Sequence, residues 1–499
     1  MVYTNWALVA ERKTAEGLDR PLVTREPKGT LKVNFGKETL GILMETKNLK
    51  KDFPDRDVPK KARDLFTRFD DLRNYNNSLE QMVTLYNYLK TDTVETEYAL
   101  ISSEMAALDR ELRAAEGSLT WNSANIWDYI EGMRKAALDL NTRVKQAQVN
   151  LVKVEDAINC WAEVPLFTRV EEEGKPSLLN LEAREENKKK RYLEILEAVT
   201  VIQSIVAQNE KLFRIAEGGA ELQVNWHKYL KYLDYMVSDG LLITIACSIG
   251  YLLDQTNPKA DIEPLFTVRL ELNDPDVIFR PSLDKSIMHN FFDMMVGIVD
   301  DIFHMAVLVP RIARQEVKEP ENDNFLQVVN GHEELAGLKK MLMDRVELVI
   351  EQANADRVTY MEYSYLWTES RQEYMFYFLL FSRQLSEDEM ALYEEDERSV
   401  KKQLPALDQF KEQIDHYEAI HAEADKIERI KVFEMWFKAD IRPLKQSLLN
   451  TIKRWSWAFQ KHELDHIIDS LNELNKFIDD ADAGLQIEVV EGDYDNLIR

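Results

Sequence analysis

The stretch that decides the fold runs from residue 222 to residue 302 and begins LQVNWHKYLKYLDYMVSDGLLITIACSIGYLLDQT, residues 222–256. Its apolar side chains recur at steps of three or four residues, at Trp226, Tyr229, Leu230, Leu233, Val237, Leu241, Ile245 and Ile249. A helix with this period carries them on one face. The stretch therefore predicts a long amphipathic helix.

The one clear β-signal of the chain follows this helix. Residues 264–272 read PLFTVRLEL, in which apolar and polar side chains alternate. Residues 273–276, NDPD, are typical of a turn, and residues 277–283, VIFRPSL, form the returning segment. The helical period then resumes at Phe291 and Met295. We expect a β-hairpin near residues 264–282, inserted between two helices.

Composition points to helices over most of the remaining chain. Its 499 residues are enough for two to four domains, and 45% of them are apolar, so large cores are possible. The 16 glycines and 14 prolines are few for this length. We predict an all-α protein, an elongated array of stacked helical bundles with one inserted hairpin.

Breaks in the helical pattern suggest a domain order. The segment WAEVPLFTRVEEEGKPSLLN, residues 161–180, contains two prolines, a glycine and three successive glutamates, which is typical of a linker. The expected order is a connector with a short strand and helix (1–56), a helical bundle (57–165), a linker (166–180), a bundle with the hairpin (181–316), a loop (317–330), long aromatic-rich helices (331–385) and a last helical bundle (386–499).

Two local features of the later helices lead to specific predictions. Residues 360–381, YMEYSYLWTESRQEYMFYFLLF, are rich in tyrosine and phenylalanine, which favours a packed seam between helices. Residues 386–389, SEDE, place a glutamate three residues after a serine, the pattern of an N-terminal capping box.

The charge balance restricts the classes of partner. A formal net charge of −26 disfavours binding of DNA or RNA through the overall field of the protein. Cys160 and Cys247 make neither a zinc spacing nor a disulfide framework, so we expect a reducing, intracellular compartment. Without about 18 uninterrupted apolar residues, no membrane-spanning helix is expected. The N-terminal residues do not resemble a signal peptide.

The sharpest enzymatic motif is His462-Glu463-Leu464-Asp465-His466, a formal HExxH. Two histidines four residues apart share one helical face and can bind zinc, with Glu463 as a general base and Glu473, Glu488 or Glu491 as a third ligand. However, Asp465 is charged where zinc peptidases are apolar, and Asp469 stands where the metzincin extension requires glycine. A zinc metallopeptidase stays an alternative to a non-catalytic role.

Three weaker motifs do not predict a site. Gly36-Lys37-Glu38 lacks the hydroxyl residue that a phosphate loop needs after its lysine. His416 and His421 are five residues apart and do not share a helical face well, and the adjacent Asp300 and Asp301 point in different directions. We predict no catalytic, metal-binding or cofactor-binding residue and no cofactor.

Short motifs along nearly the whole chain resemble the tails of dynein heavy chains, more narrowly the axonemal kind. Around the hairpin, the matching residues are Trp226, Tyr229, Tyr232, Gly240, Leu241, Tyr251–Leu253, Pro264–Phe266, Val268, Leu270, Leu272, Phe279, Pro281–Leu283, Asp300–Ile302, Pro310 and Arg311. Elsewhere they include Leu31, Val33–Phe35, Tyr86, Asn87, Leu119–Trp121, Tyr365–Trp367 and residues 492–497, GDYDNL. Gly36 departs from the family, which has aspartate there.

The resemblance implies a function without catalysis in this chain. It implies the C-terminal half of a tail that ends just before the motor linker, so we expect a piece of a longer protein or a truncated product. Such tails hold intermediate and light chains and a neighbouring heavy chain, and they connect the motor to microtubule doublets in the axoneme of a cilium or flagellum. Neither nucleic acid nor membrane is expected as a partner. A stand-alone cytosolic helical adaptor is the other alternative.

Overall fold

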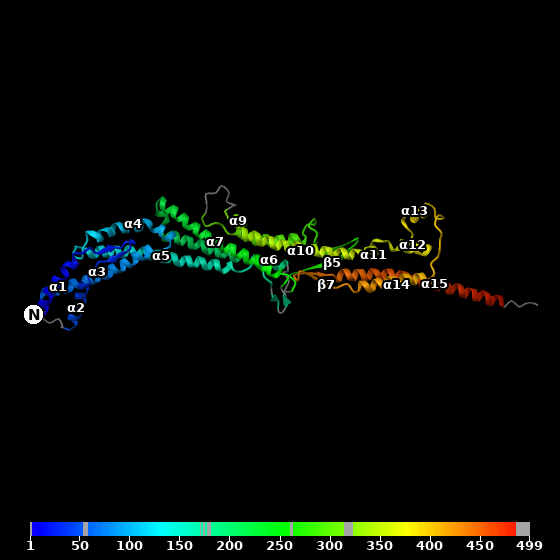
Figure 1. The fold of residues 1–499 in the computed structure, drawn as a ribbon, viewed down its shortest axis with the longest axis horizontal. Coiled ribbons are helices and arrows are strands. Elements are labelled where there is room, and N and C mark those ends of the chain that lie inside the picture. Colours follow the sequence, from blue (N-terminus) through cyan, green and yellow to red (C-terminus); the bar gives the residue numbers. More distant parts are fainter. Residues whose placement is uncertain are drawn as a thin grey trace, which may run out of the picture. The chain divides into compact units, whose positions relative to one another are not determined.

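The computed structural model describes residues 2–52, 58–169, 171–172, 175–176, 181–259, 263–313 and 323–485. Most of these residues are helical, which confirms the predicted fold class (Figure 1). The chain divides into two compact units. Unit 1 comprises Met1–Leu166, Lys188–Cys247 and Phe303–His332, and unit 2 comprises Phe167–Asn187, Ser248–Ile302 and Glu333–Arg499. Parts of the predicted linker and loop, and the GDYDNL stretch, lie outside the described residues.

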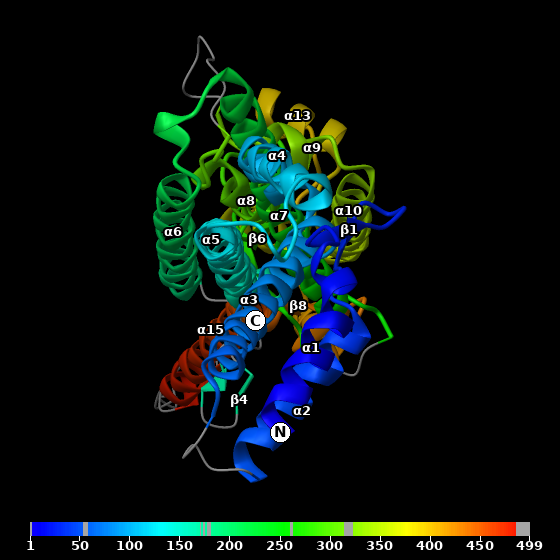
Figure 2. The ribbon, with the colours of Figure 1, turned by 90° about the vertical axis from the view of Figure 1, so that its left-hand side faces the viewer.

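Unit 1 is built mainly from long helices. Its elements are α1 (Val2–Leu18), β1 (Val23–Arg25), β2 (Leu31–Val33), α2 (Lys37–Asp52), α3 (Lys60–Thr91), α4 (Glu95–Gly117), α5 (Ile126–Ala162), most of α6 (Leu181–Leu212), η1 (Ile215–Glu217), the first part of α7 (Ala220–Gln255), the end of α8 (Phe291–Leu308) and α9 (Leu326–Asn330). Helix α3 packs along α5, and α1 and α2 lie side by side (Figure 2). The short β1–β2 hairpin turns at Gly29, whose φ of 82° favours glycine.

Unit 2 combines helices with a small mixed sheet. Its elements are β3 (Glu171–Glu172), β4 (Lys175–Pro176), the end of α7, β5 (Phe266–Asn273), β6 (Asp276–Arg280), the start of α8, α10 (Glu333–Tyr360), η3 (Met361–Tyr363), α11 (Tyr365–Thr368), α12 (Arg371–Phe381), α13 (Glu387–Glu395), α14 (Leu407–Ala424), β7 (Ile430–Phe433), β8 (Phe437–Asp440) and α15 (Arg442–Leu485). Strands β5 and β6 form the predicted hairpin. The predicted capping box at Ser386 is also present.

The hairpin belongs to a larger sheet than the sequence predicts. Its strand order is β6-β5-β8-β7, with β5 and β8 parallel and the other two pairs antiparallel. The sequence predicts a helical bundle across residues 430–440, where the structure has β7 and β8. Each of these strands is only four residues long, so its alternating pattern is too short to recognise. The backbone N–H of Leu265 donates to the Trp436 carbonyl at 2.7 Å, which helps join the two hairpins.

Helix α7 contains a long apolar segment. By length and composition it is long and apolar enough to cross a membrane, and it is the one such helix in the described part of the chain. Half of its most apolar window is buried inside the protein. The core helix of a soluble protein has the same properties, so this single helix is only a weak indication of a membrane span.

The core of unit 1 contains a chain of buried polar side chains. The Asn150 amide of α5 donates to the Asn209 side-chain oxygen of α6 at 2.6 Å, and the Asn209 amide donates to the Tyr229 hydroxyl of α7 at 2.9 Å. All three residues are buried, as is Glu97 of α4. Because buried polar groups are costly unless paired, these contacts fix which residues of the helices face one another.

The core of unit 2 contains an aromatic seam instead. The predicted seam is confirmed: aromatic residues of α11 and α12 pack with those of α14 and α15. The indole of Trp455 lies 5.3 Å from the ring of Tyr374 and 5.5 Å from that of Tyr417, measured between centroids, and its N–H donates to the Leu366 carbonyl at 2.7 Å. Such packing buries a large apolar area per residue.

Candidate docking site between strand β6 and helix α10

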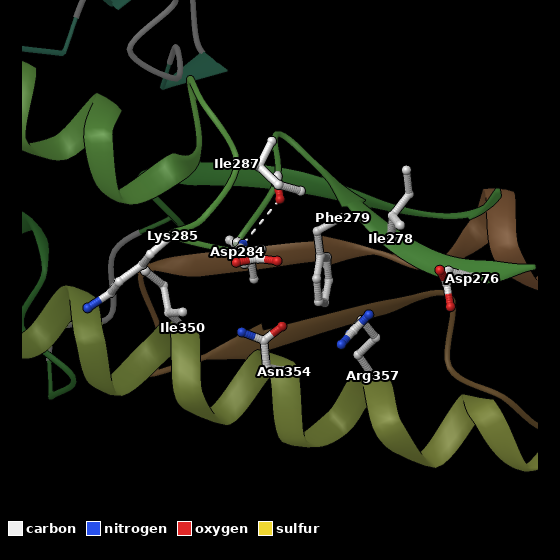
Figure 3. A pocket seen from close by; sticks show the side chains of 11 residues that line it. Asp276, Ile278, Phe279, Asp284, Lys285, Ile287, Ile350, Asn354 and Arg357 are labelled. Carbon is white, nitrogen blue, oxygen red and sulfur yellow. Dashed lines mark hydrogen bonds between the residues drawn. The ribbon is translucent and has the colours of Figure 1, made fainter.

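A hollow in unit 2 lies between β6, the loop that follows it and one face of α10 (Figure 3). Its volume is about 570 Å³, within the range of sites that bind a few side chains or a small molecule. The hollow is lined by Asp276, Ile278, Phe279, Ser282, Leu283, Asp284, Lys285, Ile287, Ile350, Asn354 and Arg357.

Helix α10 contributes three side chains from a single face. Ile350, Asn354 and Arg357 are four and three residues apart, so they stack along one side of the helix and point toward Phe279 in Figure 3. A different face of α10 is attached to β7, where the Gln352 amide donates to Glu434 at 2.7 Å and Lys431 pairs with Asp356. These contacts hold the helix across the sheet and fix one wall of the hollow.

Strand β6 forms the opposite wall and is an edge of the sheet. The Arg357 guanidinium donates from Nη1 to the Val277 carbonyl at 3.0 Å, so this carbonyl points away from β5. Because the outward and inward directions alternate along an antiparallel pair, the backbone N–H and C=O of Phe279 also point outward. The site therefore presents a strand edge, to which an extended peptide can pair as an additional strand.

The loop after β6 forms the rim. Ser286 donates from its backbone N–H and its hydroxyl to Asp284, at 2.9 and 2.8 Å, and these bonds lower the pKa of the Asp284 carboxyl with help from the charge of Arg357. The fixed loop displays Ile287 and Met288, which are 51% and 80% exposed. A polar turn thus holds two apolar side chains in solvent beside the hollow.

The chemistry of the lining suits docking of a chain segment. Ile278, Phe279 and Ile350 supply apolar surface, and Arg357 has a buried Nε without a hydrogen-bond partner among the described residues. The positive charge of the Arg357 guanidinium at this wall favours a segment that brings a carboxylate oxygen. The lining contains a serine hydroxyl, at Ser282, but neither histidine nor cysteine, the usual bases and nucleophiles.

The residues of the HExxH motif lie elsewhere, on the outer part of α15. The ring of His466 lies 6.2 Å from that of Phe410. Among the described residues, no three His, Cys, Asp or Glu side chains converge so that they could hold a metal ion. Glu488 and Glu491, two of the possible third ligands, lie outside the described part of the chain.

The weaker motifs are also distributed away from the hollow. Gly36 precedes the first turn of α2, where its carbonyl accepts from the Leu40 N–H at 2.9 Å. Asp300 lies 3.5 Å from the Lys339 ammonium. The ring of His416 contacts Tyr417, and His421 has a buried Nε2 without a partner among the described residues. The structure does not bring these groups together.

Sequence reasoning missed the hollow itself. Asn354 and Arg357 are separated from β6 by about 75 residues of chain, and neither belongs to a motif. Only the helical spacing of Ile350, Asn354 and Arg357 was available as a signal, and it does not distinguish this face of α10 from the others.

Comparisons with known proteins point to one family. A family model described as dynein heavy chain, N-terminal region 1, matches residues 1–129. The whole chain is 38% identical over 498 residues to the ciliary dynein beta chain of Heliocidaris crassispina and 33% identical over 499 residues to human dynein axonemal heavy chain 17. Over 448 residues, 88% of the chain, it is 23% identical to the flagellar outer-arm dynein beta chain of Chlamydomonas reinhardtii.

These relatives are far longer than the chain, which spans 11% of the length of the first two and 9% of the third. Their similarity nevertheless extends across all or most of its residues, and the family model concerns the N-terminal region. Along its whole length the chain is therefore similar to part of the axonemal dynein heavy chains, and its residues 1–129 match the model of the N-terminal region of dynein heavy chains.

Proposed function

We propose that this chain is a non-catalytic scaffold that binds dynein intermediate and light chains and a neighbouring heavy chain. Through them it couples a microtubule motor to its cargo, the doublet microtubules of a cilium or flagellum. The observation that carries the proposal is the end-to-end similarity to axonemal heavy chains. ATP hydrolysis and movement along microtubules belong, in this proposal, to other regions of a longer heavy chain.

The proposal also assigns a place within the tail. Residues 492–497, GDYDNL, resemble the stretch that precedes the motor linker in this family. We infer that residues 1–499 correspond to the C-terminal half of the tail and extend to the neck of the motor. In this proposal the protein is located in the cytoplasm and cytoskeleton, in the axoneme of a cilium or flagellum.

The β6–α10 hollow supports a role in holding partners. It offers a strand edge, the positive charge of Arg357 and the exposed Ile287 and Met288. A partner segment that adds to the edge of β6 would satisfy backbone groups and bury apolar surface at the same time. The wall residues are fixed by the contacts of α10, so this surface needs little rearrangement on binding.

A binding measurement with defined subunits tests the proposed function. The purified chain is mixed with recombinant axonemal intermediate and light chains, and complex formation is followed by size-exclusion chromatography and calorimetry. We expect a stable complex at micromolar concentration. Failure of every one of these subunits to bind the folded chain would overturn the scaffold proposal.

Paired variants test whether the hollow contributes. Ile287→Asp with Met288→Asp places charge on two exposed apolar side chains, and we expect at least a tenfold loss of affinity for the bound subunit. Leu404→Asp is the matched control, because Leu404 is 78% exposed in a different loop of unit 2. Equal affinities for the two variants would remove the hollow from the proposal and leave the scaffold role to other surfaces.

A further inference from the structure

Two adjoining hollows in unit 2 lie between α14 and α15, which pack side by side (Figure 1). One, of about 390 Å³, lies at the end of the helices near β7 and β8, and the other, of about 550 Å³, lies farther along. Lys453 lines both hollows. A helix rises about 1.5 Å per residue, so from Arg442 to Gln460 the two hollows extend about 27 Å along α15. We call them together the basic groove.

The hollow near the strands is lined mainly by basic side chains. Its charged lining residues are Arg429, Arg442, Lys445, Lys453 and Asp425. The chain as a whole has the opposite balance, with 89 acidic residues against 63 lysines and arginines. This end of the groove is therefore locally positive on a strongly acidic protein.

Two of these four cations are held by carboxylates of the chain. The Arg442 guanidinium donates to the two oxygens of Asp440 at 2.8 and 2.7 Å, and the Lys445 ammonium lies 3.2 Å from the one acidic lining residue. Arg429 and Lys453 are exposed, and neither forms an ion pair with another described residue. These two cations are available to carboxylates that come from outside the chain.

The second hollow adds apolar and aromatic surface. Tyr417 and Ile452 line it and are almost fully buried, whereas Trp457 is 63% exposed. Glu418 is its one acidic lining residue, and the Lys461 ammonium lies 5.8 Å from the centroid of the Trp457 ring. Tryptophan and arginine are enriched among the residues that contribute most to binding at interfaces. The groove thus combines a positive end with an aromatic end.

We propose that the basic groove binds a short extended segment of a partner protein. Acidic residues of the segment pair with Arg429 and Lys453, and an apolar side chain packs against Trp457. An extended chain rises about 3.3 Å per residue, so about eight or nine residues span the groove. This inference rests on the proposed function, because it specifies the chemistry of one partner of the scaffold.

The surrounding charges favour a short segment over larger polyanions. Helix α14 contains five acidic residues, and residues 461–485 contain seven. A nucleic acid or an anionic membrane extends beyond the groove and meets these carboxylates. A second copy of the chain brings a further net charge of −26. Charges farther away than about 8 Å are screened at physiological salt, so a short segment responds mainly to the groove itself.

Designed peptides test the charge preference. The acidic peptide has nine residues, with three aspartates at one end and two leucines at the other, and a second peptide carries asparagine in place of each aspartate. Both are labelled with fluorescein, and their binding to the full chain is measured by fluorescence anisotropy. We expect the acidic peptide to bind at micromolar concentration, at least about tenfold tighter than the asparagine peptide, and to lose this advantage in 0.5 M NaCl.

Paired charge reversals locate the binding. Arg429→Glu with Lys453→Glu should weaken binding of the acidic peptide at least about tenfold. Arg371→Glu with Arg454→Glu makes the same change in net charge at two exposed positions of unit 2 outside the groove, and it should weaken binding less than about twofold. Circular dichroism checks that each variant folds like the parent.

Trp457→Ala tests the aromatic end of the groove. It should weaken binding of the acidic peptide about threefold to tenfold, because the leucines lose their contact. Binding of a peptide with serine in place of both leucines should not change. A loss of the same size for both peptides would show that Trp457 does not contact the apolar end of the segment.

Two results would overturn the inference as a whole. They are equal binding of the acidic and asparagine peptides, and equal losses for the two pairs of charge reversals. Self-association of the chain that Lys453→Glu abolishes, or tighter binding to phosphatidylcholine–phosphatidylserine vesicles than to the peptide, would assign the groove to a different occupant and reject this one. The peptide measurement uses no dynein subunit, so its failure is distinguishable from failure of the intermediate- and light-chain experiment.

Discussion

The two compact units are both helical, but their cores are held together by different interactions. In unit 1, α5, α6 and α7 meet through the hydrogen-bonded side chains of Asn150, Asn209 and Tyr229. In unit 2, the helices meet through stacked and edge-on aromatic rings around Trp455 and Tyr417. Polar pairs make one alignment of the helices preferable, whereas aromatic packing mainly supplies buried area. A helical period in the sequence does not reveal whether a core will be held by polar pairs or by aromatic packing.

The largest expected effect comes from removing the centre of the aromatic seam. Trp455→Ala deletes ring contacts with Tyr374 and Tyr417 and should lower the free energy of unfolding by about 3–5 kcal/mol. Urea denaturation followed by circular dichroism measures the change. Trp457→Ala is the control, because this tryptophan is 63% exposed two residues away and should change stability by less than about 0.5 kcal/mol. Equal losses would show that the seam is not the core of unit 2.

The next effect concerns the polar chain in unit 1. Asn209→Ala leaves the Asn150 amide without its acceptor and the Tyr229 hydroxyl without its donor. The free energy of unfolding should fall by about 1–3 kcal/mol, the cost of leaving buried polar groups unpaired. The exposed neighbour Gln208 provides a control in Gln208→Ala. An unchanged urea midpoint for Asn209→Ala would mean that the polar contacts add no specificity to this core.

Glu97 makes the stability of unit 1 depend on pH. Burial raises the pKa of its carboxyl from 4.5 to about 7, and the nearby Gln148 side chain opposes this shift only in part. Below pH 4.5 the carboxyl is protonated whether the protein is folded or unfolded. As pH rises from 4.5 to 7, the unfolded state ionises first, so the free energy of unfolding falls across this window.

Glu97→Gln should remove that dependence. The variant is expected to equal the parent near pH 4 and to be more stable at pH 8 by about 1–2 kcal/mol. Urea midpoints measured from pH 4 to pH 8 test this difference, and Glu95→Gln, at an exposed position, should leave the profile of the parent unchanged. If the urea midpoints of Glu97→Gln and of the parent changed with pH in the same way, Glu97 would not be the source of the pH dependence.

The smallest effect is expected at the partly exposed ion pairs of Arg25. Its guanidinium contacts Glu116 at 2.9 Å through Nε and Asp109 at 2.8 Å through Nη2. Arg25→Ala should lower the free energy of unfolding by about 1 kcal/mol, because solvent screens these pairs. The loss should shrink in 0.5 M NaCl, while Arg113→Ala, at an exposed position, serves as a control. A salt-independent loss would assign the effect to packing rather than charge.

The sequence predicted the features that depend on neighbours along the chain. The period of α7, the alternation in β5 and the capping box at Ser386 are all local patterns. The features that were missed depend on residues distant in sequence. Asn150 gives no sign that it will meet Asn209, and the edge position of β6 follows only from the complete strand order. The hollow was missed for the same reason, since its two walls come from separate segments.

The parallel pairing of β5 with β8 has a consequence for synthesis. Val268 is aligned with Ala439, 171 residues later, so the first hairpin emerges from the ribosome long before its neighbour exists. At typical elongation rates of roughly 5–20 residues per second, about ten to thirty seconds separate the two. During that interval one edge of β5 is unpaired, and another nascent strand can pair with it. The hairpin is therefore exposed to mispairing until β8 arrives, as unpaired strand edges in nascent chains generally are.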